Sequence, residues 1–225
     1  MSREILPNFI AMEGTDYSGK ETNCKLTKDR LEAMGRSVLV IAFPRYSEFS
    51  GQMASRYLRG EFGESTLLSP RLSSYFYEVD RALAGYDIRN HTLQGGVAIA
   101  DRFTGSNMAH QGAKIKDKAE RITFYETCMT NEFDYLHVPQ PTRSIVLLVN
   151  KGFMGATIKS RIQRGDDLDG HERNVAYQMA VIDTYEEMCE LYPNQFIPID
   201  CMRGEERLTI EEVNDKVFSK IEEVL

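Results

Sequence analysis

The 225-residue sequence contains no tryptophan, only four cysteines and no excess of positive charge. The cysteines are far apart and form no CxxC pair or ligand spacing, which excludes an evident zinc site or disulfide framework and predicts reduced core thiols. They are Cys24, Cys128, Cys189 and Cys201. With 34 acidic residues against 27 Lys and Arg, the net charge of -7 opposes binding to nucleic acid or to anionic lipid.

Long apolar runs are also missing, and the first seven residues contain no apolar signal segment. No internal repeat, low-complexity tract or Pro/Ser-rich linker divides the chain. We therefore expect one domain over residues 1–225, located in the cytoplasm, with no membrane or nucleic-acid partner. A polyanionic small substrate would need a local cluster of Arg and Lys on this acidic protein.

Short apolar runs alternate with longer helical stretches along the chain. The runs cover residues 8–13, 37–43, 97–100, 144–149 and 196–199. Continuous apolar strands separated by helices are typical of a parallel sheet that is covered on both faces. The sequence therefore predicts a doubly wound α/β fold of about five strands, with loops near residues 60–70 and 165–170.

Two helices are predicted by their patterns. The helix over residues 20–34 ends at Gly35, which is a suitable C-cap. Ile210, Val213, Val217 and Ile221 place one apolar face on a helix over residues 208–225. Core packing explains this face fully.

A glycine-rich turn between the first strand and the first helix is the strongest functional motif. It reads Gly14, Thr15, Asp16, Tyr17, Ser18, Gly19, Lys20, Glu21 and Thr22. Such a turn points several backbone N–H groups at one phosphate, and the helix N-terminus adds its free amides and its positive dipole end. Lys20 adds a mobile charge that can reach the β- and γ-phosphates. The motif predicts a P-loop NTPase-type fold that binds a nucleotide.

Glu21 stands where this motif normally has the Ser or Thr whose hydroxyl ligates Mg²⁺. A carboxylate can hold a hard cation directly or through water, although its charge opposes the phosphates unless the metal lies between them. Thr22 keeps a hydroxyl one position later. A carboxylate also follows the third strand, where Asp101 precedes Arg102. Since the carboxyl ends of parallel strands hold the ligands of open α/β sheets, Asp101 can contribute to a metal site and Arg102 can grip a phosphate bidentately.

Five blocks of the chain resemble the thymidylate kinase family. They are the loop with its preceding Glu13, Phe43-Pro44-Arg45, Tyr77 to Arg81, Asp101 to Gln111, and the arginine-bearing stretch from Arg161 to Glu172. The Gly-Lys-Glu-Thr loop is similar to that of a subgroup of the family. The resemblance implies transfer of a phosphoryl group from ATP to dTMP, giving dTDP, with Mg²⁺ as cofactor and a homodimer as the assembly.

The resemblance places the acceptor site in the middle blocks. Tyr77 and Arg81 share a helix face, so that an aromatic plane could stack on a pyrimidine while the guanidinium bonds a base carbonyl. Asn107 and Gln111 also share a face if their segment is helical. His110 stands where relatives carry an aromatic residue that crowds the ribose 2′-hydroxyl. The predicted substrate-binding residues are Asp16, Phe43, Pro44, Arg45, Tyr77, Arg81, Arg102, Ser106, Asn107, His110 and Gln111.

A small lid over residues 153–173 is expected to close on ATP. Tyr17 and Ser18 offer no cation in the loop, so the lid arginines Arg161 and Arg164 are the candidates for the additional catalytic charge. The predicted catalytic residues are Lys20, Asp101, Arg102, Arg161 and Arg164. The nucleotide-binding set is Gly14, Tyr17, Ser18, Gly19, Lys20, Glu21 and Thr22, and the metal set is Glu21, Thr22 and Asp101.

Two alternatives remain open from the residues. The same scaffold can serve a kinase for another nucleoside monophosphate or a deoxynucleoside, because a fold does not determine a substrate. A nucleotide-binding module without catalysis is the other alternative, suggested by Glu21.

Overall fold

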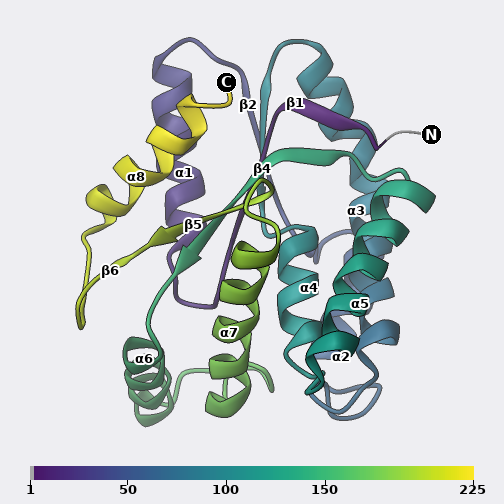
Figure 1. Cartoon of the computed structure of the whole chain (residues 1–225), viewed down its shortest axis with the longest axis vertical. Helices are drawn as coiled ribbons and strands as arrows, with labels where there is room; N and C mark the ends of the chain where they lie inside the picture. The colour runs from purple at the N-terminus through teal and green to yellow at the C-terminus, as the bar shows by residue number, and fades with distance from the viewer. Residues whose placement is uncertain (1–2) are drawn as a thin grey trace.

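The computed structural model describes residues 3–225 as a central sheet with helices on both sides (Figure 1). Five strands form one parallel sheet in the order β2-β3-β1-β4-β5. Along the chain these are β1 (Ile5–Gly14), β2 (Val38–Ala42), β3 (Val97–Asp101), β4 (Gln140–Leu148) and β5 (Phe196–Asp200). The expected α/β sheet of about five strands is confirmed.

Eight α-helices and one π-helical turn connect the strands in the described part of the chain. They are α1 (Lys20–Ala33), α2 (Phe49–Leu58), α3 (Pro70–Leu93), α4 (Thr104–Gly112), α5 (Lys118–Met129), η1 (Thr130–Tyr135), α6 (Lys151–Arg164), α7 (Val175–Leu191) and α8 (Ile210–Glu222). None of these helices is long and apolar enough to cross a membrane.

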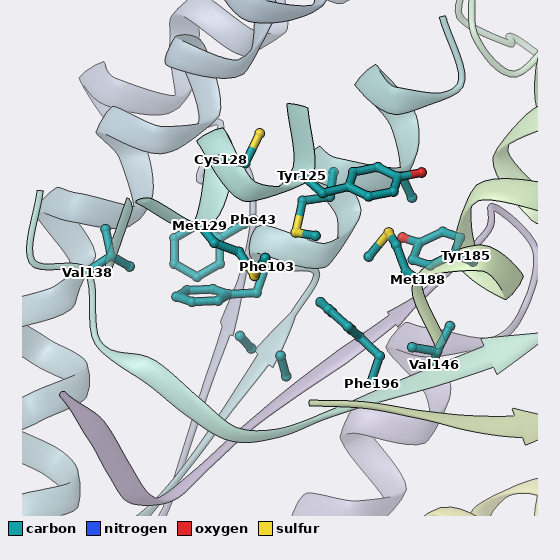
Figure 2. Packing of buried hydrophobic residues seen from close by; sticks show 14 of the residues in the cluster. Phe43, Phe103, Tyr125, Cys128, Met129, Val138, Val146, Tyr185, Met188 and Phe196 are labelled. Carbon is teal, nitrogen blue, oxygen red and sulfur yellow. The ribbon is translucent and has the colours of Figure 1, made fainter. Parts of the chain in front are cut away.

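Successive side chains of a strand point to opposite faces of the sheet, so alternate residues pack into two separate hydrophobic clusters. Phe9 and Ala11 of β1 face a cluster built with α3, α4, α5 and α7, whereas Ile10 and Met12 face one built with α1 and α8. Figure 1 shows α1 and α8 together on one side of the sheet and α3, α4 and α5 on the other. Figure 2 shows the first cluster, in which the Phe103 ring lies edge-on to Phe43 at 5.6 Å between centroids.

The structure differs from the predictions at the ends of several elements. β1 and β4 begin several residues earlier than predicted, because Ile5 and Leu6 pair with Gln140 and Pro141 ahead of an irregularity between Leu6 and Ile10. A short antiparallel hairpin of β6 (Met202–Arg203) and β7 (Glu206–Arg207) was not predicted. The assignment of Ile210 to the buried face of the last helix was wrong, since its side chain is 47% exposed at the helix start.

All four cysteines are free and buried, which confirms the prediction of core thiols. The start of α8 is stabilised by a capping box, in which Thr209 and Glu212 form reciprocal side-chain to backbone hydrogen bonds.

Candidate active site

The turn between β1 and α1 requires its glycines. Gly14 has φ 136°, and a Cβ at this position would lie 2.5 Å from the Leu147 carbonyl oxygen of the neighbouring strand. Gly19, with φ 90°, precedes the first turn of α1. Backbone N–H groups can therefore surround a phosphate in the loop without obstruction by side chains. Ser18 is buried and donates from Oγ to the Thr15 carbonyl at 2.8 Å, which stiffens the loop from inside.

Lys20 lies in a cavity at the mouth of this loop. Its Nζ donates to the Thr15 carbonyl oxygen at 2.5 Å. Burial, aided by the nearby Arg102 charge, lowers the pKa of Lys20 to about 8. The cavity, which we call the donor cavity, is lined by Asp16, Tyr17, Gly19, Lys20, Glu21, Thr22, Asp101, Arg102 and Glu172. Of the predicted nucleotide-binding residues, Gly14 and Ser18 shape the loop but do not line the cavity.

Asp101 and Arg102 lie at the carboxyl end of β3, where Asp101 pairs with Met12 of β1. Arg102 has a left-handed backbone with φ 64°, and its N–H donates to the Met12 carbonyl at 2.9 Å. This conformation is uncommon outside glycine and is frequent at functional sites. It directs the Arg102 side chain across the sheet edge to an ion pair with Asp16. Burial opposes ionisation of Asp16, but Arg102 overcomes it and holds the pKa of that carboxyl well below its usual range.

A second cavity, the acceptor cavity, opens on the other side of this ion pair. Its walls come from the phosphate loop, the loop after β2, α2, α3, the junction between β3 and α4, α4 and the segment after α6. The lining residues are Asp16, Phe43, Pro44, Tyr46, Leu58, Tyr77, Arg81, Arg102, Phe103, Ser106, Asn107, His110, Gln111, Asp169 and His171. Asp16 and Arg102 line both cavities.

The aromatic residue and the arginine of α3 occupy one wall together. Tyr77 and Arg81 are one helical turn apart and both line the cavity. Arg81 is held by Glu132 of η1 through two bonds, 2.6 Å from Nε and 2.7 Å from Nη2. Thr104 donates to the same carboxylate at 2.8 Å. Among residues 3–225 no partner is found for Arg81 Nη1, which leaves one guanidinium nitrogen available to a ligand.

Asn107 and Gln111 of α4 supply the polar part of the opposite wall. Both side chains are buried, and the helix places them on the same face. Both polar atoms of the Asn107 amide and Oε1 of Gln111 have no hydrogen-bond partner within the described chain. Buried polar groups are almost always paired in native proteins, so unpaired amides in a cavity wall indicate a missing ligand or water.

Ser106 contributes to this wall but is also tied to the core. Its Oγ donates to Glu13 and lies 3.0 Å from the Tyr185 hydroxyl. Glu13 also accepts a bond from the Phe103 N–H at 3.1 Å. Complete burial raises the pKa of Glu13 to about 7, despite the bond from Ser106. Gly105 is required here because a Cβ would lie 2.7 Å from Glu13 Oε1.

The segment Phe43-Pro44-Arg45, which was predicted to bind the substrate, lines the acceptor cavity only in part. Phe43 and Pro44 line the acceptor cavity, but Arg45 does not. The Arg45 side chain donates from Nε to Asp80 Oδ1 at 2.9 Å, and its backbone N–H donates to Asp80 Oδ2 at 2.7 Å. Ser50 donates to the same carboxylate at 2.6 Å. In the free protein Arg45 therefore anchors the loop to α3, and its contact with an acceptor phosphate stays a prediction.

Comparison with known proteins shows the family of this chain. The family model described as thymidylate kinase matches residues 12–211. The chain is 30% identical to the thymidylate kinase of Mycobacterium tuberculosis over 185 residues, which is 80% of this chain and 85% of that one. It is 26% identical to the thymidylate kinase of Bifidobacterium longum over 221 residues, covering 96% and 98% of the two chains. The chain belongs to the thymidylate kinase family.

A solved structure supports the fold independently. The structure of thymidylate kinase from Candida albicans superimposes with a TM-score of 0.70 over 99% of this chain and 93% of that chain, at 21% sequence identity. The parallel sheet and its covering helices are therefore those of a thymidylate kinase, although the sequence has diverged widely.

In this member of the thymidylate kinase family the predicted lid, residues 153–173, spans most of α6 and the segment after it, and it contributes lining residues to both cavities. The Arg161 guanidinium lies 4.8 Å from the Tyr17 ring centroid of the phosphate loop, and its Nε donates to Asp166 at 2.7 Å. Tyr17 donates to Glu172 at 2.9 Å. Within residues 3–225 the Arg164 side chain pairs only with Asp166 and Ser160, and it is 61% exposed. The geometry favours Arg161 over Arg164 as the residue closer to ATP.

The acceptor side of the lid was not predicted. Asp169 and His171 line the acceptor cavity, and the His171 ring lies 4.6 Å from that of Tyr177. Burial lowers the pKa of His171 to about 4, so the imidazole is neutral. A sequence pattern gave no signal for these residues, because their position depends on how the irregular segment after α6 folds over α4 and α7.

Several other residues were missed for the same reason. Gln178 of α7 donates to Asp16 at 2.9 Å, and Glu132 holds Arg81. Arg207 of the unpredicted hairpin donates to the Ser18 carbonyl at 2.8 Å, next to the phosphate loop. These contacts join residues that are 51 to 189 positions apart in the sequence, so spacing alone could not reveal them.

Proposed function

We propose that this chain transfers the γ-phosphoryl group of ATP to dTMP and releases dTDP and ADP. The observation that carries the proposal is the unpaired Asn107 amide with the unpaired Oε1 of Gln111, in a cavity that is also lined by Tyr77 and Arg81. A thymine offers carbonyl acceptors, an N–H donor and a π-face, and these groups match amides, a guanidinium and an aromatic ring. Membership of the thymidylate kinase family supports the same assignment.

The position of Arg102 and Asp16 supports an acceptor that already has a phosphate. Both residues line the donor cavity and the acceptor cavity, so a phosphate beside Arg102 lies between the phosphate loop and the base pocket. In this proposal Lys20 and Arg161 stabilise charge on the transferring group, and Arg102 aligns the acceptor. No protein nucleophile is needed.

The residues present fit Mg²⁺ only when a nucleotide shares in binding it. Among residues 3–225 no group of three or more His, Cys, Asp or Glu side chains could hold a metal alone. Asp101 and Glu21 line the donor cavity with Thr22, and burial raises the pKa of Asp101, with Lys20 opposing the rise. Mg²⁺ usually binds through one or two carboxylates, waters and substrate phosphates. We propose that Asp101, Glu21 and Thr22 supply such partial ligation, and the ion would neutralise phosphate charge.

The proposal is tested by measuring ADP release from ATP and Mg²⁺ with a panel of acceptors. We expect dTMP to be preferred over dUMP, dCMP, dGMP and UMP, and thymidine to be inactive because it lacks the phosphate that Arg102 binds. Lys20→Met serves as the inactive control. A preference for another monophosphate would correct the acceptor, and ATP binding without turnover on any acceptor would indicate an inactive nucleotide-binding module.

We also propose that the chain forms a homodimer in the cytoplasm. The exposed face of α3 presents an apolar stripe at helical spacing, formed by Leu72, Tyr75, Val79, Leu83 and Tyr86. Leu83 and Tyr86 are 63% and 71% exposed. One helix that packs against its own copy about a two-fold axis would cover this stripe on both chains.

The assembly is tested by light scattering with size-exclusion chromatography. Leu83→Glu on α3 should yield monomers, whereas Met34→Glu, an equally exposed residue at the end of α1 on the other side of the sheet, should leave the dimer intact. A wild-type monomer, or a dimer that tolerates Leu83→Glu, would contradict the proposed interface.

A further inference from the structure

His110 lies between the phosphate-facing arginine and a tyrosine of α7. Its Nε2 is 3.3 Å from Arg102 Nη1, and its Nδ1 is 3.4 Å from the Tyr177 hydroxyl. The same tyrosine hydroxyl is 2.8 Å from the His110 carbonyl oxygen. The imidazole is thus in contact with a polar partner at each nitrogen, and both partners come from other elements of the fold.

The donors and acceptors around this ring determine its tautomer. A carbonyl oxygen can only accept, so the Tyr177 hydroxyl must donate its one proton to the His110 carbonyl. The hydroxyl oxygen can then only accept from the ring, which places the imidazole proton on Nδ1. Arg102 can only donate, so Nε2 must present its lone pair to Nη1. Both contacts are satisfied together only by a neutral His110 protonated at Nδ1.

The charges around His110 favour the same neutral form. Burial lowers the pKa of His110 to about 3, with the Arg102 charge acting in the same direction and Asp16 opposing it. A protonated imidazole would place a positive charge and an N–H donor against Arg102. The neutral ring therefore accepts a hydrogen bond from Arg102 and does not form an ion pair with it.

The bond to His110 also decides which edge of Arg102 stays available. Arg102 Nη1 has two hydrogens, and its two contacts are His110 Nε2 and the Gly14 carbonyl at 3.4 Å. Nη2 donates to Asp16. Among residues 3–225 no partner is found for Nε–H or for the second hydrogen of Nη2. These two N–H groups together can make a bidentate contact with a phosphate.

We propose that His110 is a positioning residue for Arg102: its neutral Nδ1–H tautomer accepts from Nη1 and turns the free edge of the guanidinium toward the acceptor phosphate. This inference rests on the proposed function, because it assigns Arg102 to that phosphate. It differs from the role of the aromatic residue that relatives carry at this position, which forms a wall against the ribose 2′-hydroxyl. A wall needs only a ring of the right size, whereas the positioning role needs an acceptor atom at Nε2.

The tautomer can be measured in the free protein without any assay. Nitrogen NMR of ¹⁵N-histidine-labelled protein distinguishes protonated from unprotonated ring nitrogens, and the spectrum of a His110→Gln variant assigns the signals of His110. We expect Nδ1 of His110 to carry the proton and Nε2 to be unprotonated at pH 7. A proton on Nε2, or a charged ring at this pH, would overturn the proposal even if the chain phosphorylates dTMP as expected.

The positioning role is then tested with two variants of similar size. Gln can place its carbonyl oxygen near the position of Nε2, whereas Leu fills space without an acceptor. We expect His110→Leu to lower kcat/KM for dTMP by about 10- to 100-fold, the size expected for one hydrogen bond to a charged group. His110→Gln should stay within about threefold of wild type on the same grounds, and KM for ATP should change little in both.

The alternatives give different results. If both variants keep wild-type kinetics with dTMP and accept ribothymidine 5′-monophosphate, His110 is a sugar wall and the positioning role is wrong. Equal losses with Leu and Gln would overturn it as well. If His110→Leu does not fold, the NMR result and the His110→Gln kinetics still decide the question. Absence of turnover with every acceptor in the wild type would refute the proposed function but leave the measured tautomer as the test of the geometry.

Discussion

Replacing Asn107 by Leu should make the protein more stable and a weaker binder of dTMP at the same time. The Asn107 side chain is 3% exposed, and neither polar atom of its amide has a partner within the described chain. A side chain that is costly for the folded protein but useful to a ligand predicts effects of opposite sign on stability and binding. Most mutations that weaken binding by damaging the fold lower both.

The magnitudes follow from the two unpaired atoms. A buried unpaired polar group costs about 1–3 kcal/mol, so we expect the free energy of unfolding to rise by about 1–3 kcal/mol in the variant after partial hydration of the cavity is allowed for. In a chain of this length that corresponds to an increase in Tm of about 2–10 °C. Loss of one or two hydrogen bonds to the base should raise KM for dTMP by about 5- to 100-fold.

The assay combines calorimetry of the free protein with steady-state kinetics for dTMP and ATP. Asn214→Leu is the matched control, because Asn214 is also 3% exposed but its amide contacts Asn23, Thr27 and Arg30. The control should lower Tm and leave KM for dTMP unchanged. A lower Tm for Asn107→Leu with unchanged dTMP kinetics would refute the assignment of this amide to the base.

Three further outcomes test other parts of the site. Arg161→Met should lower kcat by about 100-fold, a loss typical of one charged group at the transition state. Arg164→Met should lower kcat by less than about threefold, because this side chain is exposed. Equal losses would contradict the assignment of the catalytic charge to Arg161. Arg81→Met should lower the free energy of unfolding by about 3–5 kcal/mol, measured in urea, since it leaves Glu132 buried without its cation. The pKa of Glu13 is about 7 in the folded protein and 4.5 in the unfolded chain, so the wild-type free energy of unfolding should fall as pH rises from 4.5 to 7. Glu13→Gln should remove roughly 3 kcal/mol of that fall. An unchanged dependence of the free energy of unfolding on pH in this variant would show that Glu13 is not responsible.

The sheet was predictable because each strand carries its own apolar signal. The runs at residues 97–100 and 196–199 correspond closely to β3 and β5, since strands buried on both faces need continuous apolar residues. The first residues of β1 and β4 were missed because Pro7 and Pro141 interrupt the apolar signal there. The hairpin of β6 and β7 contains only two residues per strand, too few for a periodic pattern.

The site was predictable where the chemistry lies within one segment. The phosphate loop and the Asp101-Arg102 pair are local, and so are the helix faces that carry Tyr77 with Arg81 and Asn107 with Gln111. The partners of these residues are not local. Arg45 was predicted to contact the acceptor phosphate, but its side chain is bound to Asp80. The spacing of these two residues in the sequence gives no sign of this ion pair.

The ion pair of Asp16 and Arg102 gives the two cavities a common boundary, and this restricts how the proposed reaction can be arranged. Phosphoryl transfer needs the attacking and leaving oxygens roughly in line, with charge spread over the transferred group between them. The only residues of the described chain that line both cavities are Asp16 and Arg102. In the proposed reaction, a γ-phosphate beside Lys20 and the phosphate of an acceptor whose base lies against Tyr77 and Asn107 therefore meet at Arg102. Because Glu172 of the predicted lid lines the donor cavity and His171 lines the acceptor cavity, we expect closure of the lid to exclude water from this boundary on both sides at once.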